Sequence, residues 1–182
     1  MGQEILRAEI ISWVKTITLA VVVTAVCKYF FFSGLVVHGE SMSPTFEDKD
    51  KVLVTKMTDI ERLDQVVFHA PDSENNYIKR VIGLPGDTVE MKDDVLYING
   101  KKVDEPYLDE NKESVMVGQK LTGDFTLAEV TGHDTVPDGH LFVLGDNRAI
   151  SKDSRIFGFI REDSVIGEVQ LRFYPINSIE TY

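Results

Sequence analysis

Residues 38–46 read HGESMSPTF, and they separate a hydrophobic N-terminal segment from a charged turn and a long stretch rich in β-forming residues. Gly, Ser and Pro favour turns, so these nine residues predict an exposed loop that presents Ser41. Taken alone, the stretch is typical of a simple turn. Its importance depends on what lies on either side of it and on two later stretches.

The segment before this loop, residues 10–32, is mostly apolar. As a helix its roughly 23 residues would be about 35 Å long, enough to cross a hydrocarbon core of about 30 Å. Lys15 and Lys28 lie near the two ends, where their side chains can reach the lipid headgroups. The segment predicts a membrane anchor after a short cytoplasmic tail, residues 1–9, with the rest of the chain on the outer side. A cleaved signal peptide and a buried core helix are the alternatives, but the loosely fitting cleavage site at residues 23–25 lies inside the apolar stretch.

The composition limits the class of protein further. The chain of 182 residues carries 30 acidic and 19 basic side chains, a net charge of −11. This acidity argues against a nucleic-acid partner, which would require a basic face. It does not favour adhesion to anionic lipid either, so contact with the bilayer depends on the apolar segment. The single cysteine, Cys27, excludes an internal disulfide, and the outer part of the chain must be stabilised by its core alone.

Short runs of β-branched and aromatic residues, bounded by turns, continue through the rest of the chain. The pair NG at residues 99–100 is a strong signal for a hairpin. Residues 104–139 are polar and irregular, and we expect loops there with a helical turn near residues 125–130. The sequence therefore predicts a mainly β fold in which distant strands close one core. The strand candidates are residues 35–38, 51–54, 65–69, 77–82, 88–92, 95–98, 101–103, 141–144 and 165–173.

Lys79 is a candidate base for a serine hydroxyl. Serine is a weak nucleophile and needs a base nearby, but a lysine with the ordinary pKa of about 10.4 is protonated at neutral pH. Burial can lower the pKa to about 7–8, because a low dielectric disfavours the ammonium. In a strand, Lys79 shares one face with Tyr77 and Val81, while Arg80 points to the other face. Arg80 stays charged wherever it lies, so Lys79 is the better candidate; two ordinary strand charges are the alternative.

Residues 38–46, 77–87 (YIKRVIGLPGD) and 145–155 (GDNRAISKDSR) together resemble the motif set of the type I signal peptidases, peptidase family S26. These are membrane-bound serine proteases with a Ser/Lys dyad. The resemblance covers nearly the whole chain, with the motifs in the same order. The single N-terminal hydrophobic segment and the short chain most resemble the Gram-positive bacterial branch.

The resemblance implies a signal-peptidase-like β fold with a catalytic core of residues 33–84 and 140–182 and a smaller inserted β region, residues 85–139. It also implies an endopeptidase, anchored in the cell membrane, that removes N-terminal signal peptides from exported precursor proteins. Cleavage is expected after small residues at substrate positions −3 and −1, through an acyl-enzyme. No cofactor and no metal is implied.

The same resemblance implies a role for each motif position. Ser41 would be the nucleophile, Lys79 the general base, and the Ser151 hydroxyl would hydrogen-bond and orient the lysine amine. The backbone N–H of Ser41 is expected to stabilise the oxyanion. Some members carry a second donor, a hydroxyl two positions upstream, where this chain has Gly39, and that donor remains unassigned.

Two ion pairs are expected to support this site, Arg80 with Asp146 and Asp153 with Arg155. The alternatives without a functional role are that Asp146 simply stabilises a turn and that Asp153 lies in a solvent-exposed loop. Residues 35–38 could pair with an extended substrate as an added strand. The candidate substrate-binding residues are Leu35, Val36, Val37, Met42, Phe46 and Ile78, for which core packing is the alternative interpretation.

Other classes of protein fit the sequence less well. A Ser/His/acid hydrolase would need one of the four histidines, but none lies in a matching context; they are His38, His69, His133 and His140. A metal site lacks ligand-like spacing. A membrane-anchored binding or assembly module without catalysis is the main alternative, and a soluble self-cleaving Ser/Lys regulator is opposed by the anchor. The sequence does not fix the oligomeric state.

Overall fold

The computed structural model describes residues 2–56, 59–116 and 118–182, and within the first helix it describes the side chains of residues 7 and 9–26. The predictions for Cys27 and Lys28 concern side chains outside these described residues. The chain divides into two units, one ending at Ser33 and the other covering Gly34–Tyr182.

The first unit is the helix α1 (Gly2–Phe31). Its residues Glu9–Val26 have a mean hydropathy of 1.7 and, by length and composition, are suited to cross a membrane. The described side chains of this helix are exposed, including the indole of Trp13. A continuous apolar helix of this length is what a hydrocarbon core requires. The apolar segment predicted at residues 10–32 therefore lies almost wholly in one unbroken helix.

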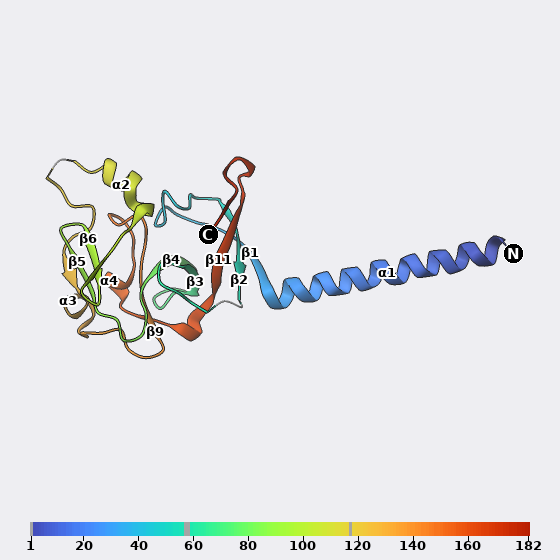
Figure 1. Ribbon diagram of the computed structural model, residues 1–182, viewed down its shortest axis with the longest axis horizontal. Helices are drawn as coiled ribbons and strands as arrows, with labels where there is room; N and C mark the ends of the chain where they lie inside the picture. Colours follow the sequence, from blue (N-terminus) through green and yellow to red (C-terminus); the bar gives the residue numbers. More distant parts are fainter. Residues whose placement is uncertain (1, 57–58, 117) are drawn as a thin grey trace. The chain divides into compact units, whose positions relative to one another are not determined.

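The framework of the second unit is an eight-stranded sheet. Its strands are β1 (Phe32–Val36), β2 (Lys51–Thr55), β3 (Gln65–His69), β4 (Asn76–Gly83), β9 (His140–Leu144), β10 (Ile160–Arg161), β11 (Val165–Tyr174) and β12 (Glu180–Thr181). The order is β1-β2-β11-β3-β4-β9-β10, with β12 paired to β11. The long strand β11 runs antiparallel to both β2 and β3, between which it lies (Figure 1). Strands from the two ends of this unit thus share one sheet, as the sequence predicts.

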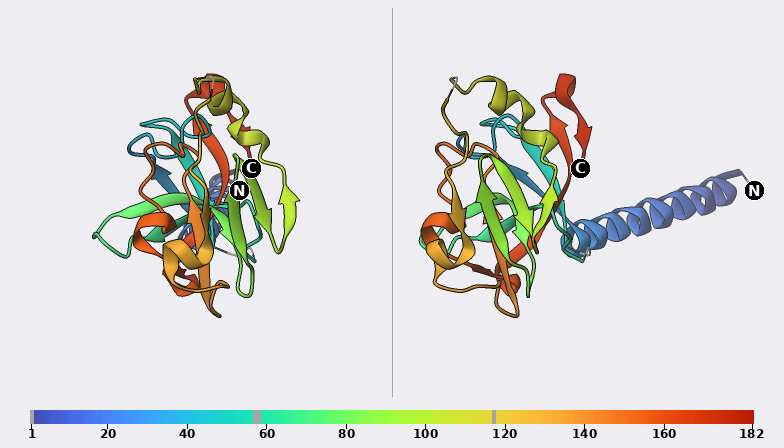
Figure 2. Two further views of the ribbon diagram at one scale, coloured as in Figure 1. Left: turned by 90° about the vertical axis from the view of Figure 1, so that its left-hand side faces the viewer. Right: turned by 60° about the vertical axis from the view of Figure 1, so that its left-hand side comes forward.

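A second, four-stranded sheet has the order β7-β6-β5-β8. Its strands are β5 (Val89–Lys92), β6 (Val95–Ile98), β7 (Lys101–Val103) and β8 (Phe125–Thr126), and β5, β6 and β7 lie side by side (Figure 2). The predicted hairpin joins β6 and β7, and Asn99 and Gly100 both have positive φ, 53° and 71°. These values suit a two-residue turn, for which Asn-Gly is the preferred pair.

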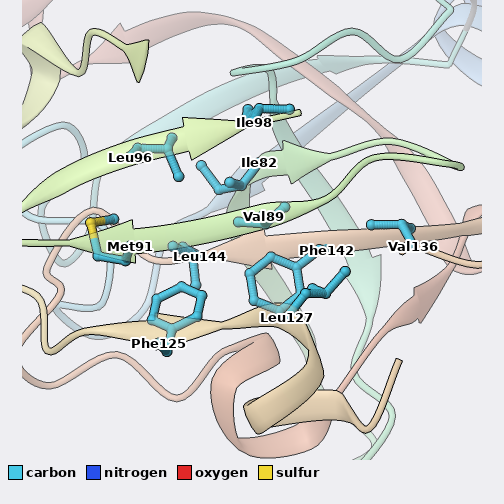
Figure 3. Close-up of a cluster of buried hydrophobic side chains, with 10 residues drawn as sticks. All are labelled: Ile82, Val89, Met91, Leu96, Ile98, Phe125, Leu127, Val136, Phe142 and Leu144. Carbon is cyan, nitrogen blue, oxygen red and sulfur yellow. The ribbon is translucent and has the colours of Figure 1, made fainter. Parts of the chain in front are cut away.

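The two sheets share a hydrophobic core, shown in Figure 3. Ile82 of β4 and Phe142 and Leu144 of β9 pack with Met91 and Leu96 from the smaller sheet. All of these side chains are almost fully buried. Because burial of apolar surface is the main source of stability, this contact fastens the four-stranded sheet to the strand that carries Lys79.

The remaining elements are short. They are η1 (Pro106–Leu108), α2 (Asp109–Glu113), α3 (Leu127–Thr131), α4 (Ser154–Phe157), η2 (Glu162–Ser164) and η3 (Ile176–Ser178). The helical turn expected near residues 125–130 is α3, which begins with a capping box between Thr126 and Glu129. Sequence analysis did not predict α2, whose five residues have no hydrophobic periodicity.

Candidate active site

Ser41 lies in the turn that follows β1, and neighbouring residues hold that turn through buried side chains and hydrogen bonds. The side chains of Met42 and Phe46 are buried, and the Phe46 N–H donates to the Met42 carbonyl at 3.0 Å. The Asp50 carboxylate accepts from the Glu47 N–H at 3.0 Å and closes the turn. Ser41 is half-buried and is presented by a loop with well-defined hydrogen bonds and apolar anchors.

Lys79 reaches the serine from β4. Its Nζ atom donates to the Ser41 Oγ at 2.6 Å and to the Ile78 carbonyl at 2.9 Å. Lys79 is only 3% exposed, and its Nζ atom lies 5.5 Å from the centre of the Tyr77 ring. Tyr77 and Lys79 therefore share a face, as the alternation of the strand predicts. The structure brings together the two residues that the sequence suggested as a dyad.

The environment of the lysine lowers its pKa. Burial is the largest cause, and it lowers the pKa of Lys79 from 10.5 to about 8. The carboxylates of Asp153 and Asp146 act in the opposite direction, because a negative charge favours the ammonium. Each of these acids forms an ion pair with an arginine, Arg155 and Arg80 respectively, which offsets its influence. A substantial fraction of the amine is therefore neutral at mildly alkaline pH.

Arg80 points away from the lysine and pairs with Asp146. Its Nε and Nη2 atoms donate to the two carboxylate oxygens at 2.9 and 2.6 Å, and both side chains are buried. The Thr45 hydroxyl donates to the same carboxylate at 2.6 Å. The Tyr107 ring centre lies 3.8 Å from the Arg80 guanidinium carbon. The pair thus connects β4 with the loop of Ser41 and with the stretch 145–155.

Asp153 organises the third motif from within. Its fully buried carboxylate accepts from the Gly145 N–H at 3.0 Å and from the Arg155 guanidinium through two hydrogen bonds of 2.8 Å. It also accepts from the Arg155 backbone N–H at 3.3 Å, so it is the N-cap of α4. Both ion pairs suggested by the sequence are present.

Ser151 lies near Ser41, but the expected hydrogen bond from its hydroxyl to the Lys79 amine is not formed. Its Oγ atom is buried and, among the residues that the structure describes, has no hydrogen-bond partner. It packs closely on Gly145, where an added Cβ would lie 2.1 Å from the Ser151 Oγ and 2.5 Å from the Ser41 carbonyl oxygen. Such an unpaired buried hydroxyl is costly.

A groove with a volume of about 460 Å³ opens beside the dyad. It is lined by residues 35–39, 41–42, 67 and 75–79. Five of the six residues suggested for substrate binding line it; they are Leu35, Val36, Val37, Met42 and Ile78. Residues 76–79 of strand β4 pair with β3 on one side only. The pairing of β4 with β9, on the other side, begins at Arg80. The segment at residues 76–79 therefore has one edge on which an extended chain could lie.

Phe46 does not belong to this groove, which corrects the prediction for that residue. Its side chain is 0% exposed, and its ring lies 4.8 Å from the Tyr182 ring within a core cluster that includes Val52 and Val169. Core packing, the alternative interpretation, explains it. Phe46, four residues after Met42, therefore packs in the core under the loop and does not reach the groove.

The oxyanion donors can be compared by their present hydrogen bonds. The Gly39 N–H donates to the Asp48 carboxylate at 3.0 Å, and Gly39 has a φ of +82°. This N–H is therefore already occupied. Within the described residues the Ser41 N–H donates no hydrogen bond, while the Ser41 carbonyl accepts from the Asn147 N–H at 3.1 Å. The loop conformation leaves the Ser41 N–H as the free donor.

The histidines do not form a triad with the serine. His38 lines the groove, but 81% of its side chain is exposed, and its ring lies 3.9 Å from Asp48. No hydrogen bond joins a histidine ring to Ser41 in the described parts of the chain. Nor do the described residues contain a cluster of three or more His, Cys, Asp or Glu suited to a metal ion.

Sequence reasoning missed three residues that contact this site. Thr45 binds Asp146, Tyr107 stacks on Arg80, and the Asn111 amide donates to the carbonyl oxygens of Ser43 and Asp146. Thr45 lies inside the first motif, so its hydroxyl could have been considered. Tyr107 and Asn111 lie in a polar segment without periodicity, and no local pattern marks them.

Comparisons with known proteins agree with one another. A family model described as "Signal peptidase, peptidase S26" matches residues 10–174. A signal peptidase I of Bacillus caldolyticus is 52% identical over 161 residues, which are 86% of this chain and 87% of the relative. A signal peptidase IB of Staphylococcus aureus is 41% identical over 183 residues, which are 96% of this chain and 95% of the relative. The crystal structure of a signal peptidase I from Enterococcus faecalis is similar with a TM-score of 0.61 and 47% identity, covering 62% of this chain and 98% of that one.

Proposed function

The chain belongs to the signal peptidases of family S26, and from this membership we propose how its residues carry out the reaction. The protein is a membrane-associated serine endopeptidase, signal peptidase I, and its substrates are precursor proteins that carry a signal peptide. We assign the nucleophile to Ser41 and the general base to Lys79. The observation that carries this assignment is the 2.6 Å contact between the Lys79 Nζ and the Ser41 Oγ at a nearly water-free position.

The reaction starts with the neutral amine of Lys79. It takes the proton from the Ser41 hydroxyl as Oγ attacks the scissile carbonyl carbon, and the resulting ammonium then gives a proton to the departing amine. The Ser41 N–H donates to the negative oxygen of the tetrahedral intermediate. Water, deprotonated by Lys79, then hydrolyses the ester between Ser41 and the signal peptide. The Ser151 hydroxyl orients the amine between these steps.

The groove supports the proposed choice of substrate. Val37, Met42 and Ile78 line it together with Ser41, and we assign the space among them to the small side chains at positions −3 and −1. An extended substrate segment pairs with residues 35–38 on one side and with the open edge of residues 76–79 on the other. Pairing through the backbone accommodates many sequences, while the pockets for alternate side chains select the small ones.

The anchor places enzyme and substrate at one surface. In our proposal residues 10–32 span the membrane, residues 1–9 lie in the cytoplasm, and the catalytic unit lies outside the cell. Confinement to the bilayer raises the effective concentration of membrane-inserted precursors. Protease treatment of intact protoplasts tests this orientation: it should digest the catalytic unit, and protection of that unit would contradict the proposal.

The function is tested with purified full-length enzyme in detergent and a purified precursor. Wild-type enzyme should release a mature protein whose new N-terminus follows a small residue, as shown by N-terminal sequencing. Ser41→Ala and Lys79→Ala should fold normally and release none. His133→Ala is the matched control, because His133 is exposed and does not line the groove, and it should retain activity. Cleavage by the folded Ser41→Ala variant would contradict the assignment.

A binding or assembly module without catalysis is not favoured. Such a module would have no reason to bury an amine against a hydroxyl, because the desolvation lowers stability without a structural benefit. It predicts that Ser41→Ala and Lys79→Ala leave function intact in cells, and the same variants therefore separate the two explanations.

A further inference from the structure

The side-chain amide of Asn111 bridges two loops of the active site. Asn111 lies on α2, outside all three motifs, and its Nδ2 atom donates to the Ser43 carbonyl at 3.1 Å and to the Asp146 carbonyl at 3.0 Å. Ser43 is two positions from Ser41, and Asp146 is the second residue of the stretch 145–155 that carries Ser151. One NH₂ group has two protons and can satisfy both acceptors. The contact therefore joins the loop that carries Ser41 to the loop that carries Asp146 and Ser151.

The chemistry of this bridge requires an amide. Both acceptors are carbonyl oxygens, so only the NH₂ side of Asn111 can face them. A carboxylate of the same shape would place a negative charge next to two carbonyl oxygens, each of which carries a partial negative charge. The two loops also meet at a second point, where the Asn147 N–H donates to the Ser41 carbonyl at 3.1 Å. Asn111 thus reinforces a junction that lies directly beneath the nucleophile.

The helix that carries Asn111 is itself firmly attached. The fully buried Arg148 donates to the Gly145 carbonyl at 3.1 Å and to the Tyr107 hydroxyl at 3.3 Å, and it pairs with the buried Glu105. Glu105 and Tyr107 lie immediately before α2, and the Tyr107 ring also stacks on Arg80. Because these groups are buried and mutually paired, α2 has a fixed position from which Asn111 can hold the loops.

We propose that Asn111 is a positioning residue for catalysis: its amide holds the loop of Ser41 against the loop of Ser151 and so keeps the Ser41 Oγ within reach of the Lys79 amine. The inference rests on the proposed function of the dyad and extends it to the inserted region of the fold. Asn111 does not line the substrate groove, so its contribution concerns the chemical step rather than substrate binding. It also forms no hydrogen bond with Lys79 in the described structure, so the pKa of the base should not depend on it.

The test uses full-length enzyme and compares Asn111→Ala and Asn111→Asp with wild type and with Glu113→Ala. Glu113 lies on the same helix and is exposed, so its variant controls for disturbance of α2. Asn111→Asp keeps the shape and removes the donors. We expect kcat to fall by between about tenfold and about 100-fold in both Asn111 variants, as for a small misplacement of reacting groups. KM and the apparent pKa of the pH–rate profile should stay at their wild-type values. Both variants should remain folded, with a melting temperature lowered by the loss of the two hydrogen bonds.

Three outcomes would overturn the proposal. The first is wild-type kcat in a folded Asn111→Asp variant, since its donors are gone. The second is a loss of activity that appears as a raised KM or a shifted apparent pKa. The third is failure of both variants to fold, because the amide would then hold the fold itself. Ser41→Ala, measured in parallel, keeps the two hypotheses apart: activity in that variant would contradict the dyad, whatever Asn111 does.

Discussion

The Lys79 Nζ lies 2.6 Å from the Ser41 Oγ, although strands β2 and β3 separate the two residues along the chain. The contact is made where water is excluded, since Lys79 is 3% exposed. Burial lowers the pKa of the amine to about 8, so a base is available under conditions in which an ordinary lysine is protonated. The fold tolerates an unfavourable buried charge at Lys79, and the consequences can be measured.

Lys79→Met should raise the stability of the protein at neutral pH. In the folded wild type the amine has a pKa of about 8 against 10.5 in the unfolded chain, so the buried ammonium destabilises the fold by up to about 3 kcal/mol below pH 8. The penalty disappears as the pH rises from about 8 to 10.5, where the unfolded chain also loses its proton. Urea denaturation should therefore show a stabilised variant at pH 7 and a smaller difference near pH 10. Equal stability of the two proteins at pH 7 would contradict a buried charge.

Ser151→Ala should impair turnover without destabilising the protein. The hydroxyl is buried and has no partner among the described residues, so its removal breaks no hydrogen bond within the chain. Turnover should fall by up to about 100-fold if the hydroxyl orients Lys79 during the reaction. Thermal melting and cleavage rates, measured on the same samples, separate these effects. Wild-type turnover in Ser151→Ala would remove Ser151 from the mechanism.

Gly145→Ala should damage both activity and stability. An added methyl group would lie 2.1 Å from the Ser151 Oγ and 2.5 Å from the Ser41 carbonyl oxygen, and backbone cannot give way as a flexible side chain can. Overpacking of this kind costs about 1–3 kcal/mol. Gly123→Ala is the control, because its methyl group would meet no atom within 4 Å. Equal melting temperatures and equal cleavage rates for the two variants would show that the close packing of Gly145 against Ser41 and Ser151 does not matter for function.

Asp146→Ala should destabilise the protein strongly. It would leave the buried Arg80 guanidinium without its partner, at a cost of about 3–5 kcal/mol. Asp163→Ala, which breaks the exposed pair with Arg161, should have little effect, since water and salt screen exposed charges. Denaturation curves of the two variants provide the comparison. A similar midpoint for both would contradict the structural role of the Arg80–Asp146 pair.

Local patterns predicted much of this molecule. The alternation around Lys79 placed Tyr77 on the same face and Arg80 on the other, because a strand has a period of two residues. The hairpin turn at Asn99 and Gly100 was predicted by turn chemistry alone. The continuous apolar helix was predicted by length and hydropathy.

What the sequence missed depends on contacts between segments that are distant along the chain. Phe46 is apolar and close to Ser41, and only the packing of Tyr182 beneath the loop places it in the core rather than in the groove. Asn111 has no local signal, since its partners, Ser43 and Asp146, come from two other loops. The proximity of Ser41 and Lys79 itself followed from the family resemblance and not from periodicity, because no local rule relates a loop to a strand that is distant along the chain.

The pKa of the Lys79 amine tests the central claim most directly. It can be measured by NMR titration of the side-chain nitrogen or of its neighbouring carbon in labelled full-length enzyme, with the signal assigned by its absence from Lys79→Met. We predict a pKa of about 8, together with a kcat/KM that rises by about tenfold per pH unit below this value and levels off above it. An ordinary pKa of about 10.4 for the amine would contradict a lysine base at this site.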